Sequence, residues 1–449
     1  MSKDIRIKKG LDIKLVGEAA QTTSIVAVKG VFALKPEDFH GIIPKLIAKE
    51  GAEVQAGESL FYSKSDDRIL FSSPVSGKVT EIIRGAKRKI VSIKITADGK
   101  QSYKDFGKQD VEKMSAEEVK NHLFNSGCWP FVKQRPFDVI ANPNQAPKSI
   151  FISAYASSPL AADYDYTLAG KEKELQAAVT AISKLTIGSV HVSVGKDSNS
   201  PFAGLENIEL HKVSGPHPVG NLSTQISQID PLNKGEVVWV ISPQDLLVIG
   251  ELLLTGNFNI TRTLALTGSQ FEKPAYVSVV AGASISAIVA KNINTDNARI
   301  ISGNVLSGTQ VSEDGFLGYY DNQITAIPEG DDYEFFGWNK PVFNKISPSR
   351  ALTFSWLTPK KKYDLNTNTN GEHRAFVVTG SYENVFPLDM FPLQFLKACM
   401  YLDLDEMENL GGYEVAPEDF ALTEFICVSK QPHQKIVREG LDLMKEELG

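Results

Sequence analysis

The segment at residues 72–82, SSPVSGKVTEI, decides how the N-terminal quarter of the chain is interpreted. Pro74 and Gly77 separate two short runs in which apolar and polar residues alternate, and this pattern predicts a β-hairpin. The alternation at residues 91–95 (VSIKI) predicts a further strand with one buried face. We therefore expect an all-β module over residues 36–98.

The apolar and glycine residues upstream of this segment have the spacing of biotinyl and lipoyl carrier domains. The spacing is set by Gly51, Val54, Gly57 and Leu60. Such domains present a modified lysine at a hairpin tip, which we expect here at residues 65–68 (SDDR). Lys64 is close, but the residues that a lipoylating enzyme reads around its target are missing. The sequence predicts a carrier-like scaffold without a carried group.

Length and composition indicate a multidomain globular protein. A chain of 449 residues exceeds the size at which one core stops growing, so two to four domains are expected. A net charge of −7 provides no basic excess to displace counterions from phosphates, which argues against a nucleic-acid partner. The start of the chain lacks the apolar run of a signal peptide. The three cysteines are odd in number and far apart, which suits a reducing cytoplasm.

The two most apolar segments, residues 237–254 and 274–290, are both interrupted by polar or small residues. Neither offers the roughly 20 successive apolar residues that a transmembrane helix requires. We expect no transmembrane segment, so that any association with a membrane is peripheral.

Strands and helices alternate after residue 149. Strands are predicted at residues 149–154, 189–194 and 236–241, and helices at residues 171–185 and 243–255. The second helix has the clearest ends, with Ser242 as N-cap, Pro243 at the first position, Asp245 as the acid of a capping box and Gly256 after the last turn. This alternation predicts a mostly parallel, Rossmann-like sheet.

The expected fold class is multidomain α+β, in five parts. They are an N-terminal segment (1–35), the carrier-like module (36–98), the Rossmann-like domain (99–258), a small β-grasp-like module (259–330) and a C-terminal segment with a helical domain (331–449).

The sequence lacks the common motifs of cofactor binding and catalysis. No two glycines are separated by one residue, which excludes a GxGxxG dinucleotide loop, and no Gly-Lys pair precedes Ser or Thr as in a phosphate loop. The cysteines form no CxxC pair, and no HxxxH or GxSxG pattern occurs. We expect no tightly bound cofactor, no metal site and no independent catalytic residue on this chain.

Eight short motifs, in order along the whole chain, resemble one family. They are IKKGLD (7–12), SSPVSGKV (72–79), RGAKR (84–88), SGCWPFVKQRPF (126–137), PLAAD (159–163), SGPHP (214–218), ISGNVLSG (301–308) and GSYEN with PLD (380–389). Together they look like the A subunits of the Na+-translocating NADH:quinone reductases. That family is similar to the C subunit of the Rnf complex and to the flavin subunit of complex I, whose cofactor motifs are missing here.

The resemblance implies a peripheral subunit on the cytoplasmic side of the bacterial inner membrane. It implies five further subunits as partners, especially a membrane subunit, with quinone as substrate. The FMN, FAD, iron–sulfur and NADH sites are then expected on other subunits. The complex as a whole would reduce quinone to quinol and export sodium.

A quinone site needs apolar walls, an aromatic face and one or two hydrogen-bond donors. The segment at residues 129–137 interleaves aromatics with cations, so the predicted quinone contacts are Trp129, Phe131, Arg135, Pro136 and Phe137. A second candidate precedes the carrier-like module and consists of Phe39 and His40. The opposing interpretation is that the aromatics form an inter-domain core and that Arg135 belongs to a surface ion pair. Under that interpretation the chain is a cofactor-free docking subunit with no ligand of its own.

Overall fold

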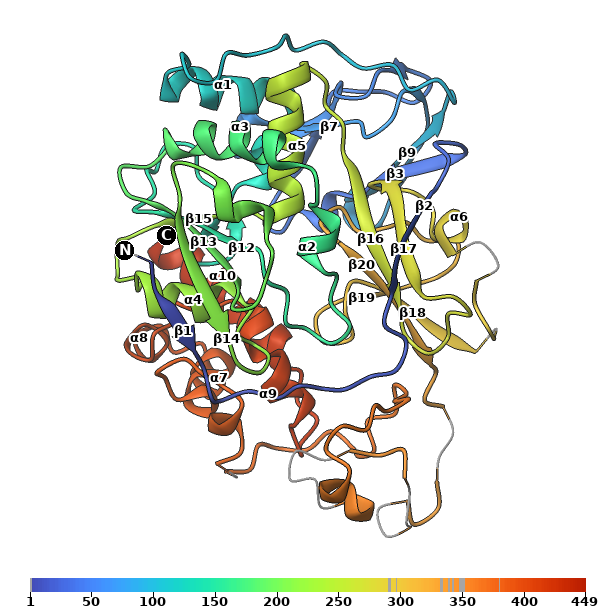
Figure 1. The fold of residues 1–449 in the computed structure, drawn as a ribbon, viewed down its shortest axis with the longest axis vertical. Coiled ribbons are helices and arrows are strands. Elements are labelled where there is room, and N and C mark those ends of the chain that lie inside the picture. The colour runs from blue at the N-terminus through green and yellow to red at the C-terminus, as the bar shows by residue number, and fades with distance from the viewer. Residues whose placement is uncertain are drawn as a thin grey trace.

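The computed structural model describes residues 2–289, 292–295, 297–331, 334–337, 340, 343–346, 352–378 and 380–449. It is a mixed α/β structure with four sheets. Figure 1 shows the seven-stranded sheet on the left, the six-stranded sheet on the right and the C-terminal helices, in red, below the former.

Two small antiparallel sheets form the N-terminal module, with strand orders β3-β9-β8-β5 and β4-β6-β7. The strands are β3 (Val31–Leu34), β4 (Pro44–Leu46), β5 (Glu53–Val54), β6 (Ser59–Ser63), β7 (Asp66–Ser72), β8 (Gly77–Arg84) and β9 (Ile90–Ala97). The hairpins are β6–β7 and β8–β9.

The prediction of a hairpin at residues 72–82 is wrong. Strand β7 pairs with β6 and strand β8 with β5 and β9, so the segment crosses from one sheet to the other. The link at residues 73–76 is buried. Gly77 then has a φ of +155°, and a Cβ there would lie 2.1 Å from the carbonyl oxygen of Thr96. A glycine is needed because the backbones approach so closely, not because the chain turns back on itself.

The tip between β6 and β7 is held in place. Its turn lies at Lys64 and Ser65, one residue earlier than we predicted. Arg68 donates to Asn144 (2.9 Å) and lies over the ring of Phe124 (5.5 Å). The tip therefore rests on the neighbouring domain.

The central sheet has seven strands in the order β1-β14-β13-β12-β15-β10-β11. They are β1 (Asp4–Arg6), β10 (Lys133–Arg135), β11 (Val139–Ile140), β12 (Ile150–Ser153), β13 (Val190–Gly195), β14 (Glu209–Ser214) and β15 (Val238–Val240). The first five in this order are parallel, β10 is antiparallel to β15, and β11 is antiparallel to β10. After β12 the chain adds β13 and β14 on one side and then β15 on the other, so the topology reverses between β12 and β15.

Helices cover both faces of this sheet. Helices α3 (Glu172–Ser183) and α5 (Pro243–Thr255) lie on one face and α4 (Leu222–Ile229) on the other. Helix α1 (Ala116–Ser126) packs against β7 and α3, and α2 (Tyr164–Thr167) contacts Tyr276 through Tyr166. Ile150 and Ile152 share a core with α3 and α5, whereas Phe151 points to the face covered by α4. Because successive side chains of a strand point to opposite faces of the sheet, β12 contributes residues to the cores on both faces.

Helix α5 has the predicted ends but not the predicted capping box. Ser242 accepts a hydrogen bond from the backbone N–H of Asp245 (3.2 Å), and Gly256 ends the helix with a φ of 80°. The carboxylate of Asp245 instead pairs with the buried guanidinium of Arg262. A buried cation requires a partner charge, and this requirement outweighs the local cap.

The third region is a mixed six-stranded sheet with the order β19-β18-β20-β16-β17-β2. Its strands are β2 (Ala20–Ile25), β16 (Thr261–Thr267), β17 (Ala275–Val280), β18 (Ala298–Ser302), β19 (Thr309–Val311) and β20 (Gln323–Pro328), with α6 (Ile285–Val289) beside them. Because β1 and β2 join different sheets, the N-terminal segment connects two domains.

The C-terminal helices are α7 (Pro392–Tyr401), α8 (Leu404–Asn409), α9 (Ala421–Phe425) and α10 (His433–Leu448). Phe137 and Val139, which flank the bend between β10 and β11, belong to the core of these helices. The C-terminal region is therefore anchored on the predicted quinone segment. Among the described residues, no helix is long and apolar enough to cross a membrane.

Candidate functional site

Strand β10 divides the predicted quinone segment between two faces. It follows a 3-10 helix at Trp129–Phe131 and ends in a bend where Phe137 and Asp138 have φ values of 77° and 52°. Positive φ is uncommon for residues other than glycine. Lys133 and Arg135 point to one side of the strand and Gln134 to the other, as strand geometry requires.

Two of the predicted aromatic contacts are core residues. Trp129 is fully buried, donates from Nε1 to the carbonyl oxygen of Ala141 (2.9 Å) and packs edge-on against Trp239 (5.3 Å). Phe39 is buried with its ring 4.4 Å from Phe71. Neither lines the two cavities described below. For Trp129 and Phe39 the structure favours the inter-domain core over a quinone contact.

Arg135 belongs to a buried ion pair, not to a surface one. Its side chain is 3% exposed and pairs with Asp138 and with Glu418 (3.4 Å). Arg438 reinforces the bend by donating to the carbonyl oxygen of Phe137 (2.8 Å) and to Asp138 (3.1 Å). Burial alone would raise the pKa of Asp138, but the guanidinium of Arg135, with Lys133 and Arg438, lowers it to about 2. Both charges of this pair are thus fixed.

The first cavity, which we call the strand-end cavity, lies at the carboxyl ends of β12 and β15 and has a volume of about 300 Å³. Its lining includes Phe131, Lys133, Arg135, Tyr164, His217, Asp245, Tyr320 and Glu418. This is the point of topology reversal, where open α/β sheets commonly bind ligands. Its polar walls already contain the ion pairs just described, and Lys133 lies over the ring of Tyr320 (3.9 Å).

The second cavity, the helix-side cavity, is larger, at about 570 Å³. It lies between the carrier-like module, the bend after β10 and the end of α10. Its lining includes His40, Ile42, Ile69, Gln134, Pro136, Phe137, Val139, Ile140, Tyr413, Lys445 and Leu448. Apolar side chains form much of the wall, and the polar side chains of His40 and Lys445 also line it.

The structure therefore divides the seven predicted site residues. His40, Pro136 and Phe137 surround the helix-side cavity, Phe131 and Arg135 line the strand-end cavity, and Trp129 and Phe39 are core. His40 is 42% exposed and pairs with Asp442 on α10 (2.7 Å).

Sequence reasoning missed the contribution of the C-terminal helix to this site. Lys445 reaches toward the carrier-like module, because a Cβ on Gly41 would lie 3.5 Å from its Nζ atom. No local pattern at residue 445 indicates this, since the contact joins residues about 400 positions apart.

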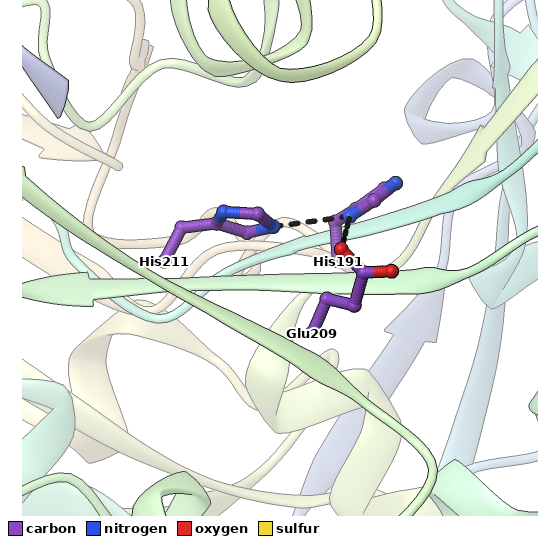
Figure 2. A group of neighbouring side chains, drawn as sticks. All are labelled: His191, Glu209 and His211. Atoms are coloured by element: carbon purple, nitrogen blue, oxygen red, sulfur yellow. Dashed lines mark hydrogen bonds and ion pairs between the residues drawn. The ribbon is translucent and has the colours of Figure 1, made fainter. Parts of the chain in front are cut away.

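A third group of side chains lies at the amino ends of β13 and β14 (Figure 2). His191 and His211 are hydrogen-bonded through Nδ1 and Nε2 (3.0 Å), and a carboxylate oxygen of Glu209 lies 3.9 Å from His191 Nδ1. Among the described residues, these three have ligand atoms close enough together to hold a metal ion. Of the three, only His191 lies in a predicted strand, at residues 189–194; Glu209 and His211 lie two residues apart on β14, which was not predicted from the sequence.

Family models match three parts of the chain. Residues 5–98 match the NqrA N-terminal barrel-sandwich hybrid domain, residues 114–258 the NqrA second alpha/beta domain and residues 263–313 the NQRA C-terminal domain. Among solved structures, an NAD+-reducing [NiFe]-hydrogenase is similar at 11% identity, covering 64% of this chain and 57% of that chain. Its TM-score of 0.33 is too low to carry an argument.

Curated relatives match along the full length. The A subunit of the Na(+)-translocating NADH-quinone reductase from Haemophilus influenzae is 35% identical over 448 residues, covering 99% of this chain and 100% of the relative. The corresponding A subunits from Neisseria meningitidis and Histophilus somni are 36% and 35% identical with the same coverage. The chain belongs to the family of A subunits of the Na+-translocating NADH-quinone reductases.

Proposed function

We propose that this chain is a peripheral subunit, on the cytoplasmic side of the membrane, that binds the quinone of the reductase in the helix-side cavity. The observation that carries the proposal is the lining of this cavity, which combines apolar walls with His40 and Lys445. The other five subunits, especially a membrane subunit, would supply the electrons from NADH and the path for sodium.

The size and walls of the helix-side cavity suit a quinone. Ligand pockets typically measure about 300–1,000 Å³ and are lined mainly by apolar groups with a few placed polar ones. At about 570 Å³ the cavity falls within this range. Phe137 offers an aromatic face, and it is fixed by an edge contact with Tyr413 (6.1 Å between ring centroids).

The polar groups of the cavity suit the two oxygens of a quinone. Lys445 can donate to a carbonyl oxygen, and His40, whose neighbour Gly41 lies close to the Lys445 ammonium, can supply a second donor. Asp442 pairs with His40, so it also holds that ring in position. Such donors interact more strongly with a reduced quinone oxygen, which carries more negative charge.

We also infer that the seven-stranded sheet is a Rossmann-like domain without a nucleotide. The strand order with its reversal between β12 and β15 supports this inference. FMN, FAD, iron–sulfur and NADH sites would then lie on other subunits. The small module at residues 259–330 would correspond to the β-grasp-like part.

The second candidate function is docking without a ligand. Two observations favour it: Trp129 and Phe39 are core residues, and the carrier-like module exposes Ile43 (64%) and Ile47 (48%). Apolar side chains exposed at this level suit contact with another subunit. Quinone affinity separates the two candidates.

The test compares Lys445→Met with Lys435→Met in the isolated chain. Both lysines lie on α10, but Lys435 is 73% exposed and does not line the cavity. Removing a charge-assisted hydrogen bond of about 1.5–3 kcal/mol should weaken the binding of a short-chain quinone roughly 10- to 150-fold in Lys445→Met. Lys435→Met should bind like the wild type in isothermal titration calorimetry. Equal affinities for both variants, or no saturable binding to the wild type, would favour docking.

A further inference from the structure

The group formed by His191, Glu209 and His211 takes no part in either cavity. It lies at the amino ends of the parallel strands β13 and β14, whereas the strand-end cavity lies at the carboxyl edge of the same sheet. Its chemistry therefore needs its own explanation.

Strand register brings the three side chains together. His191 pairs with Glu209 across β13 and β14, and His211 lies two residues beyond Glu209. Paired residues, and residues two apart on one strand, project from the same face of a sheet. Figure 2 shows the three side chains converging, with His191 Nδ1 between the other two.

The distances suit one metal ion. Two nitrogen ligands bound at about 2.0–2.1 Å to a tetrahedral Zn²⁺ lie about 3.3 Å apart. The two histidine nitrogens are 3.0 Å apart, and Glu209 Oε2 is 3.9 Å from His191 Nδ1. The Glu209 side chain is 34% exposed. A small movement of this carboxylate would bring it into the coordination sphere, and solvent could supply a fourth ligand.

The surroundings prepare the donors. His191 Nδ1 and His211 Nε2 face each other across a hydrogen bond, so at least one of these two nitrogens carries a lone pair. Ser189 donates to Glu209 Oε1 (2.8 Å), and Oε2 of the same carboxylate lies 3.9 Å from His191 Nδ1. Such support of a ligand by a neighbouring hydrogen bond is usual at metal sites.

One contact would have to change when a metal binds. The backbone N–H of Lys3 donates to His211 Nδ1 (3.1 Å), so the ring proton lies on Nε2 and points to His191. A metal on Nε2 moves this proton to Nδ1, where it faces the N–H of Lys3. Lys3 directly precedes β1, a strand of three residues at the sheet edge. Metal binding should therefore loosen the start of β1.

We propose that His191, Glu209 and His211 form a site for a divalent transition-metal ion, with Zn²⁺ as its probe, and that the metal competes with the anchoring of β1. Two imidazoles and one carboxylate are borderline ligands, which select Zn²⁺ and related ions over Mg²⁺ or Ca²⁺. The opposing explanation is a structural pair of histidines that only fixes Lys3.

The first test is calorimetric titration of Zn²⁺ into the full chain, without a histidine tag and after treatment with a chelator. One equivalent should bind. His211→Gln should abolish this binding, and Glu209→Gln, a change of similar size at a partly exposed position, should weaken it at least about tenfold. His373→Ala removes an exposed histidine elsewhere and serves as the control. Melting temperatures identify any variant that fails to fold.

The second test is hydrogen exchange at the amide of Lys3 with and without Zn²⁺. The amide should lose protection when the metal binds, and in Glu209→Gln the same loss should require at least about tenfold more Zn²⁺. Zn²⁺ binding that is equal in Glu209→Gln and His373→Ala would overturn the site. So would stoichiometric binding that leaves the protection of Lys3 unchanged.

Discussion

The strand-end cavity and the helix-side cavity lie on the two faces of β10, and they use their charges differently. In the strand-end cavity Arg135 is buried and paired with Asp138 and Glu418, so its charge is already satisfied. In the helix-side cavity His40 is half exposed and shares one carboxylate, that of Asp442. The first arrangement stabilises an interface between domains, and the second, in our proposal, provides donors for a quinone. A cation next to aromatic residues therefore indicates a binding site only when its charge is not already buried with a partner.

The largest effect that this comparison predicts is on stability. Arg135→Ala removes the buried cation that pairs with Asp138 and Glu418; because Arg438 still pairs with Asp138, the free energy of unfolding should fall by at most about 3–5 kcal/mol. Lys113→Ala breaks an exposed pair of the same spacing, with Asp110, and should change stability by less than about 1 kcal/mol. Urea denaturation measures both. Quinone affinity of the folded Arg135→Ala protein should match that of the wild type, and a loss of affinity would assign Arg135 to the quinone.

The next largest effect is expected when a phenylalanine is changed to leucine on one or the other face of β10. Phe131 lines the strand-end cavity and Phe137 the helix-side cavity. Each change to leucine should reduce stability by less than about 1.5 kcal/mol. Phe137→Leu should also weaken quinone binding roughly 2- to 12-fold, since an aromatic contact contributes about 0.5–1.5 kcal/mol. Titration calorimetry should find no such change in Phe131→Leu; the reverse order would move the quinone to the strand-end cavity.

The smallest expected effect is a pH dependence of the free energy of unfolding, which arises from Glu418 in the strand-end cavity. Burial raises the pKa of Glu418 from 4.5 to about 7, and the carboxylate of Asp419 adds to this. The folded state holds the proton of Glu418 more tightly than the unfolded state does. The contribution of this group to the free energy of unfolding therefore falls as the pH rises from 4.5 to 7 and stays constant at higher pH. The side chain is 43% exposed, so we expect a fall of less than about 1 kcal/mol.

Glu418→Gln tests this, because it removes the titrating group. Its free energy of unfolding should fall less between pH 5 and pH 8 than that of the wild type. Glu439→Gln, at an exposed position, should keep the full fall. Parallel pH profiles for Glu418→Gln and the wild type would contradict the raised pKa of Glu418.

Local patterns predicted many elements, including β12, β13, β15, α3 and both ends of α5. They failed where distant contacts decide. Pro74 and Gly77 indicate a change of direction, but only the pairing of β7 with β6 and of β8 with β9 shows that the chain crosses between sheets. Asp245 does not form the predicted capping box because its carboxylate pairs with Arg262, which is 17 residues away in the sequence.

The sequence indicated only part of the candidate site, again because contacts between distant residues decide which side chains line it. The alternation of aromatics and cations at residues 129–137 identified a segment that borders two cavities. It could not indicate which side each residue faces without the register of β10 against β15. Lys445 joins the site only because α10 packs against the bend at Phe137, a contact between residues about 300 positions apart.

Photolabelling tests the central claim most directly. The assembled reductase is treated with a photoreactive quinone, with and without excess unlabelled quinone, and the peptides of this chain are mapped by mass spectrometry. The account predicts competed adducts in peptides that contain residues 40–42, 136–145 or 441–449, which surround the helix-side cavity. Competed adducts confined to residues 153–158, 217–222 or 240–245 of the strand-end cavity, or none on this chain, would contradict it.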